Sequence, residues 1–184
     1  KMLISPADRV LVTAPTYLGA LQAFAPNQPL YEIWRPSPNG VSTEPANSER
    51  PSNARRALAY VVPDFANPSG ETLCEKTRCK MLQFADHLDI PLIEDSLYEM
   101  LRFDGIPQPA IQALDVDSKG SIENSRVIYC GSFSKIFAPG LRVGWVCAAT
   151  EVINRLTLIK QSSDLNSPAI NQRVMLQLAR ESFN

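Results

Sequence analysis

Short apolar segments alternate with segments of helical periodicity along most of the chain, and this alternation restricts the fold more than any other feature. Apolar runs predict strands at residues 10–14, 30–34, 58–62, 90–94, 126–130 and 143–147. The clearest helical pattern covers residues 72–88, where apolar side chains recur every three or four positions. The sequence therefore predicts an α/β fold, with three α/β/α layers built around a mostly parallel central sheet.

Residues 35–56 interrupt this pattern. They are polar, rich in proline, serine and asparagine, and show no periodicity. We therefore predict an irregular insertion or loop over residues 35–56.

Charge and cysteine content exclude several classes of protein. The formal net charge is -1, from 18 Lys+Arg and 19 Asp+Glu, which argues against a general nucleic-acid binder. No apolar run approaches the roughly 20 residues needed to span a membrane. The four cysteines form no CxxC pair and His87 is the only histidine, so we expect no metal site. Sparse, irregularly spaced cysteines favour a reducing compartment, and we expect a cytoplasmic protein.

Chemically active side chains follow the predicted strands. Ligands of open α/β sheets bind at the carboxyl ends of the strands, where these side chains should meet. The candidates are Tyr17, Asn67, Asp95, Tyr98, Ser132, Ser134, Lys135 and Arg142. The set includes two hydroxyls, an amide, a carboxylate, a lysine and an arginine. Such side chains are suited to binding or catalysis rather than to packing in a core.

This set matches the requirements of pyridoxal phosphate. A lysine at a strand end can form a Schiff base with the cofactor's carbonyl group. The ring nitrogen needs an acidic partner, and the phosphate needs hydroxyl donors and a guanidinium. An aromatic neighbour suits the ring face, and an amide and a phenol suit the ring oxygen.

Four motifs carry a resemblance to a known family. They are Asn67-Pro68-Ser69-Gly70, Asp95-Ser96-Leu97-Tyr98, Ser132-Phe133-Ser134-Lys135 and Pro139-Gly140-Leu141-Arg142. In this order and spacing they resemble fold-type I, class I/II aminotransferases, which depend on pyridoxal phosphate. Residues 15–24 and 164–168 resemble the branch that contains α-aminoadipate and broad-specificity aminotransferases.

The resemblance implies a role for each candidate. Lys135 would carry the Schiff base and move the proton, and Asp95 would pair with the ring nitrogen. Asn67 and Tyr98 would bind the ring oxygen, and Tyr17 would stack on the ring. Ser132, Ser134 and Arg142 would hold the phosphate. Lys135, Asp95 and Tyr98 are the predicted catalytic residues in transfer of an amino group from an amino acid to a 2-oxo acid.

The resemblance also implies what lies outside the chain. Residues 1–184 resemble part of the cofactor-binding large domain, without the N-terminal segment and the small C-terminal domain of the family. We therefore expect a homodimer for the full-length protein and little activity for this segment alone. The expected partners are amino acid and 2-oxo acid substrates, with no nucleic acid bound by this segment and no membrane.

Other functions stay open. Some winged-helix transcriptional regulators carry an aminotransferase-like effector domain that senses the same cofactor. A lyase or decarboxylase could use the same cofactor residues, because function is grafted onto the site rather than set by the fold. Ser132-Phe133-Ser134-Lys135 also matches the S-x-x-K signature of serine acylases, but the companion motifs S-D-N and K-T-G are missing.

Overall fold

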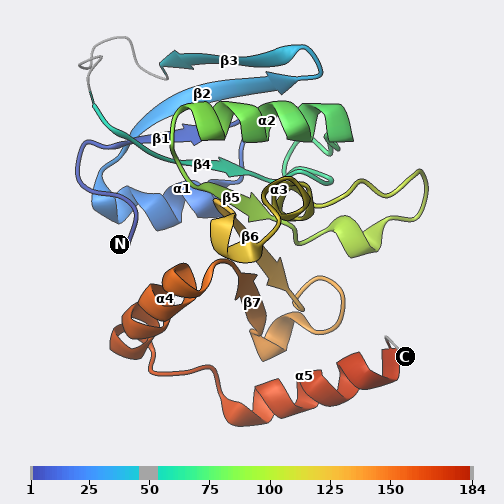
Figure 1. Ribbon diagram of the computed structural model, residues 1–184. Coiled ribbons are helices and arrows are strands. Elements are labelled where there is room, and N and C mark those ends of the chain that lie inside the picture. The colour runs from blue at the N-terminus through green and yellow to red at the C-terminus, as the bar shows by residue number, and fades with distance from the viewer. Residues whose placement is uncertain (1, 46–53, 183–184) are drawn as a thin grey trace.

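The computed structural model describes residues 2–45 and 54–182 (Figure 1). Its strands are β1 (Arg9–Val12), β2 (Leu30–Ser37), β3 (Gly40–Pro45), β4 (Arg56–Val61), β5 (Leu92–Asp95), β6 (Val127–Ser132) and β7 (Gly144–Cys147). Its α-helices are α1 (Leu18–Phe24), α2 (Glu75–His87), α3 (Ile111–Lys119), α4 (Thr150–Ser163) and α5 (Ala169–Ser182). Short 3-10 turns occur at Ala25–Asn27, Glu99–Leu101, Ile122–Asn124 and Pro139–Leu141.

All the described strands join one sheet in the order β3-β2-β1-β4-β5-β6-β7. Strands β2, β1, β4, β5 and β6 run parallel to one another, and the edge strands β3 and β7 pair antiparallel with β2 and β6. The predicted α/β class and mostly parallel sheet are therefore confirmed. Parallel strands need covered faces, which agrees with the continuous apolar runs that encode them.

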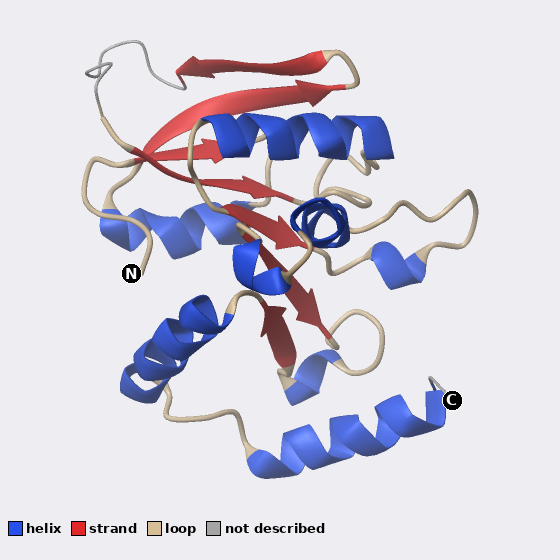
Figure 2. Ribbon diagram, in the orientation of Figure 1, coloured by secondary structure: helices blue, strands red, loops and turns tan. Residues whose placement is uncertain are grey.

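Helices cover both faces of the sheet (Figure 2). On one face, α2 packs on a core that includes Leu11, Ala59 and Leu92, with Met81 and Ala85 supplied by the helix. On the opposite face, α1 packs over a second core that contains Val10, Val12, Leu58 and Tyr60. Alternate residues of one strand point to opposite faces, so β1 and β4 contribute to both cores. These are the three predicted layers.

The prediction of an irregular loop over residues 35–56 is wrong for residues 35–45. β2 continues to Ser37 and β3 runs back along it, with Ser37 opposite Gly40 and Glu32 opposite Pro45. Arg35 and Glu44 form an ion pair across the two strands, with 2.5 Å between Nη2 and Oε1. β3 pairs with β2 along its whole length, and its side chains alternate: Val41 and Thr43 are half-buried, whereas Ser42 and Glu44 are exposed. Val41, which packs against the core, is the one large apolar side chain of this strand, so the sequence shows little apolar periodicity. Residues 46–53 lie outside the described part of the chain.

No helix within the described ranges is both long and apolar enough to cross a membrane. α5 lies at the end of the fold beyond β7 (Figure 1), and its Met175 is buried. Asn171 in α5 donates a hydrogen bond to the Leu141 carbonyl at 2.8 Å, which links this helix to the loop before β7.

Candidate functional site

The predicted site residues gather at one edge of the sheet because the parallel strands end there. Tyr17 follows β1, Asn67 follows β4, Asp95 ends β5 and Ser132 ends β6. Because β7 is antiparallel to β6, with Gly144 opposite Ser132, β7 begins at this same edge. Arg142, two residues before β7, therefore returns to the edge that Ser132 occupies.

Asp95 is held by Tyr60, a residue that the sequence analysis did not select. The Tyr60 hydroxyl donates a hydrogen bond of 2.5 Å to Asp95 Oδ2. Burial raises the pKa of Asp95, while the hydrogen bond from Tyr60 acts in the opposite direction. The pKa of Tyr60 is raised well above its usual range by burial and by Asp95, with a smaller contribution from Tyr17. Tyr60 therefore stays protonated and acts as the donor.

One property of the sequence pointed to Tyr60. After Arg56, its strand is otherwise aliphatic, and a buried tyrosine hydroxyl normally needs a hydrogen-bond partner. Tyr60 and Asp95 lie 35 residues apart in sequence, on neighbouring strands and on the same face of the sheet. Finding the partner therefore required the order of the strands.

Lys135 lies in a tight loop between β6 and β7. Phe137 N–H donates to the Phe133 carbonyl at 2.9 Å, and Phe133 packs on Trp145 with ring centroids 4.7 Å apart. The Lys135 side chain is exposed, and its Nζ lies 6.0 Å from the centroid of the Tyr98 ring. The aromatic packing therefore anchors the loop while the amine stays accessible next to Tyr98.

Ser132, Ser134 and Arg142 form a cluster of hydrogen-bond donors. Ser134 N–H donates to Ser132 Oγ at 3.1 Å, and Arg142 Nη1 lies 3.3 Å from Ser134 Oγ. The Arg142 backbone is left-handed, with φ of 54°, and its guanidinium also donates to the Pro139 carbonyl. Two hydroxyls and an exposed guanidinium so close together form a good anion site.

Asn67 and Tyr17 flank this cluster without a hydrogen bond from their side chains to another described residue. Asn67 is exposed at the tip of the loop after β4. Tyr17 is 37% exposed and lies at the start of α1. Both therefore lie at the edge where the parallel strands end, and their roles toward a cofactor stay predictions.

A buried ion-pair network fixes the loop that carries Asn67. Asp64 contacts Arg78 from α2 and Arg102 from the segment after β5, each at 2.8 Å. Arg78 is fully buried and also donates to the carbonyls of Leu73, Pro63 and Pro109. The network joins the loops that bear Asn67 and Tyr98.

Glu94 points to the opposite face of the sheet from Asp95 and has a structural role. Its carboxylate accepts hydrogen bonds of 2.8 Å from the backbone N–H groups of Ile111 and Gln112, at the start of α3. The group is completely buried, and burial raises its pKa to about 7, although these two backbone hydrogen bonds act to lower it.

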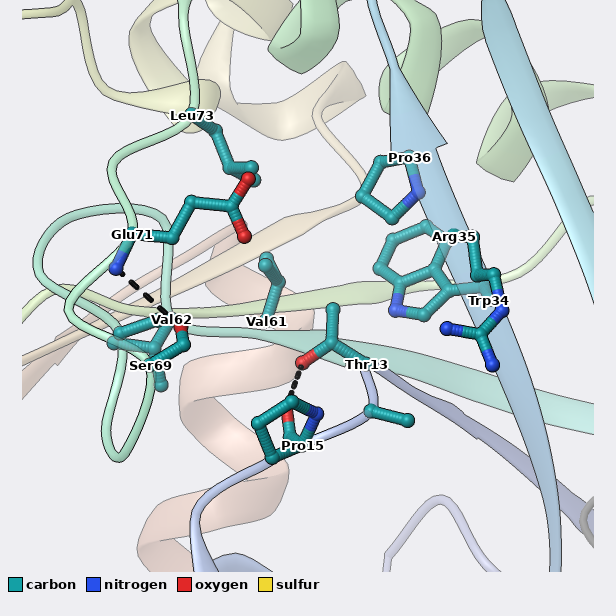
Figure 3. Close-up of a pocket in the computed structure, with 12 residues that line it drawn as sticks. Thr13, Pro15, Trp34, Arg35, Pro36, Val61, Val62, Ser69, Glu71 and Leu73 are labelled. Carbon is teal, nitrogen blue, oxygen red and sulfur yellow. Dashed lines mark hydrogen bonds between the residues drawn. The ribbon is translucent and has the colours of Figure 1, made fainter.

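A cavity of about 170 Å³ is lined partly by Ala66 and Ser69, from the loop that carries Asn67 (Figure 3). Trp34, Val61, Leu73 and Glu71 also line it. The buried indole Nε1 of Trp34 has no hydrogen-bond partner among the described residues. None of the predicted site residues lines this cavity, so it is distinct from the cluster around Lys135.

Comparison with known proteins agrees with the motifs. The family model for class I and II aminotransferases matches residues 2–183. The chain is 37% identical to aromatic-amino-acid aminotransferase 1 of Thermococcus litoralis over 176 residues, covering 94% of this chain and 40% of that protein. It is 34% identical to the uncharacterized HTH-type transcriptional regulator YdfD of Bacillus subtilis, covering 94% of this chain and 34% of that protein.

A solved structure of an aminotransferase also matches the chain. The α-aminoadipate aminotransferase LysN of Thermus thermophilus, in complex with N-(5'-phosphopyridoxyl)-L-leucine, superposes with a TM-score of 0.82 at 31% identity. The match covers 99% of this chain and 46% of LysN, so the chain spans less than half the length of each of these proteins. The chain belongs to the class I and II aminotransferase family.

Proposed function

We propose that the complete gene product is a pyridoxal-phosphate-dependent aminotransferase that moves an amino group from an amino acid to a 2-oxo acid. The proposal rests on one observation: four kinds of chemical group lie at the same edge of the sheet. They are an accessible lysine amine, a partly buried carboxylate, a set of anion-binding donors and an aromatic ring.

The residues fit the cofactor. The phosphate matches the donors of Ser132, Ser134 and Arg142, two of which already lie 3.3 Å apart. The Asp95 carboxylate has one oxygen engaged by Tyr60, which leaves the other for the ring N–H. When bound, pyridoxal phosphate supplies a conjugated ring that accepts the electron pair left behind when an amino-acid carbon loses its proton.

The remaining roles belong to the chain. Lys135 would hold the cofactor through its amine, and the same amine would accept and return the proton of the substrate carbon. Tyr17 would lie against the ring, and Asn67 and Tyr98 would donate to the ring oxygen. We also propose a cytoplasmic homodimer, on the resemblance to the family; light scattering of the purified protein tests the dimer.

Trapping the bound cofactor tests the proposal. The complete gene product is mixed with pyridoxal phosphate, reduced with borohydride and digested, and the labelled peptide is identified by mass spectrometry. We expect the label on Lys135, its loss in Lys135→Arg, and its retention in the matched control Lys160→Arg, which changes an exposed lysine of α4. A label elsewhere, or none, contradicts the proposal.

A regulator is the second candidate, favoured by the similarity to YdfD. A regulator would bind the cofactor at Lys135 but leave it unchanged when amino acids are added. An aminotransferase converts the cofactor to its pyridoxamine form and releases a 2-oxo acid. A lyase or decarboxylase releases other products, which chromatography of the reaction mixture separates.

A further inference from the structure

Tyr60 has no part in the roles assigned above, yet it makes the most direct contact with Asp95. It lies on β4, is only 3% exposed, and donates to Asp95 Oδ2 across the gap to β5. We propose that Tyr60 is a positioning residue that holds Asp95 as an ionised acceptor for the ring nitrogen of the bound cofactor. The inference rests on the proposed function, because it concerns the same cofactor.

The Tyr60 ring is fixed by its surroundings. It packs edge-on against Phe24 of α1, with ring centroids 5.8 Å apart and ring planes at 80°. Its strand lies inside the sheet, with β1 on one side and β5 on the other. The hydroxyl therefore has little freedom to leave Asp95, and the carboxylate is held in one orientation.

Burial raises the pKa of Asp95, and the hydrogen bond from Tyr60 opposes this rise. Cys130 lies opposite Asp95 on β6, and burial, with Asp95 and Glu94 contributing, raises the pKa of its thiol to about 12. Tyr60 and Cys130 are therefore both neutral near pH 7, and Tyr60 is the described residue that donates to the Asp95 side chain.

Loss of the Tyr60 hydrogen bond should change the protonation state of Asp95. Burial already favours the protonated form of Asp95, and the Tyr60 hydrogen bond opposes it. Without the hydrogen bond, the carboxylate competes better for the proton that it shares with the ring nitrogen. With the cofactor bound, Asp95 would then hold the proton in place of the ring nitrogen, and the uncharged ring would be a weaker electron acceptor.

The variant Tyr60→Phe tests this in the complete gene product loaded with pyridoxal phosphate that carries ¹⁵N in its ring. We expect the ¹⁵N resonance to move from the pyridinium towards the pyridine position. We also expect the cofactor dissociation constant to rise about tenfold, the effect of losing a hydrogen bond to a charged group. A Tyr60→Phe protein with the wild-type resonance overturns the inference.

The matched control is Tyr31→Phe. Tyr31 packs against the same core, and its hydroxyl donates to the Leu21 carbonyl at 3.2 Å, not to a site residue. Both variants remove one tyrosine hydroxyl from this face of the sheet. Tyr31→Phe should leave the ¹⁵N resonance unchanged, and an equal shift in both variants overturns a specific role for Tyr60.

A second substitution covers the case in which Tyr60→Phe does not fold. Replacing Tyr60 with 3-fluorotyrosine keeps the packing and makes the hydroxyl a stronger donor, so the pKa of Asp95 should fall. Carboxyl ¹³C titration of the apoprotein, assigned with Asp95→Asn, measures this without cofactor. An unchanged pKa overturns the inference whether or not Lys135 is labelled. Absence of label on wild-type Lys135 overturns the proposed function, whatever the pKa of Asp95.

Discussion

The ring of Tyr17 lies against the backbone of Gly19. A Cβ atom added at Gly19 would come within 2.5 Å of the Tyr17 Cζ and Oη atoms, closer than any side chain tolerates. Gly19 is therefore the residue that allows the Tyr17 ring to fold back over the start of α1. Gly19 has no side chain to contact a cofactor, but it sets the position of the Tyr17 ring, which we propose covers the cofactor.

Gly19→Ala should displace Tyr17 and weaken cofactor binding. Loss of one aromatic contact predicts a rise of about three- to tenfold in the dissociation constant for pyridoxal phosphate. Thermal stability should change little, because alanine favours the helix by about 1 kcal/mol and offsets part of the strain. Gly140→Ala is the control, since a Cβ there meets nothing within 4 Å. Unchanged affinity in Gly19→Ala contradicts the role of Tyr17.

Arg142→Lys should weaken binding through the phosphate alone. Lysine keeps the charge but cannot reproduce the planar donors of the guanidinium. A charged hydrogen bond is worth about 1.5–3 kcal/mol, so we expect a 10- to 100-fold higher dissociation constant for pyridoxal phosphate. The dissociation constant for pyridoxal, which has no phosphate, should stay the same. Equal losses for both ligands show that Arg142 does not bind the phosphate.

Arg78→Met should destabilise the fold strongly. Removal of one partner from a buried ion pair leaves Asp64 inside the protein with fewer donors, at a cost of about 3–5 kcal/mol. Urea unfolding of the complete gene product measures this cost. Lys76→Met, an exposed position on the same helix, should change stability by less than about 0.5 kcal/mol. Similar midpoints for the two variants contradict the structural role of Arg78.

Glu94 should make stability fall as pH rises from about 4.5 to 7. The folded protein holds the Glu94 proton more tightly than the unfolded chain, because burial raises the pKa from 4.5 to about 7. Its contribution is therefore fully present below pH 4.5 and is lost as pH rises through 7, about 3 kcal/mol in total.

Glu94→Gln removes this titration, so its unfolding free energy should vary less than that of the wild type over this pH range. Denaturant unfolding at a series of pH values measures the difference. Glu75→Gln is the control, because Glu75 is exposed and should leave the pH dependence unchanged. A Glu94→Gln profile parallel to that of the wild type contradicts a buried, titrating Glu94.

Local sequence patterns predicted most of the helices and strands. The helix expected at 72–88 is α2 (Glu75–His87), and each expected strand has a counterpart within a few residues. One hairpin was missed: its turn is Pro38-Asn39, between the paired residues Ser37 and Gly40. Only one large apolar side chain, Val41, marks the buried side of β3, which is too few to show a strand pattern in the sequence.

The sequence by itself determined the α/β class, the order of the elements and the identity of the side chains at the strand ends. Each of these depends on residues close together in the chain. Only the tertiary structure decided that Tyr60 meets Asp95 and that Asp64 meets Arg78 and Arg102. These contacts join residues 14 to 38 positions apart in the sequence, so they form only when the strand order and the helix packing bring the residues together. Each buried polar group then gains a hydrogen-bond or ion-pair partner, which compensates for the water that it loses on burial.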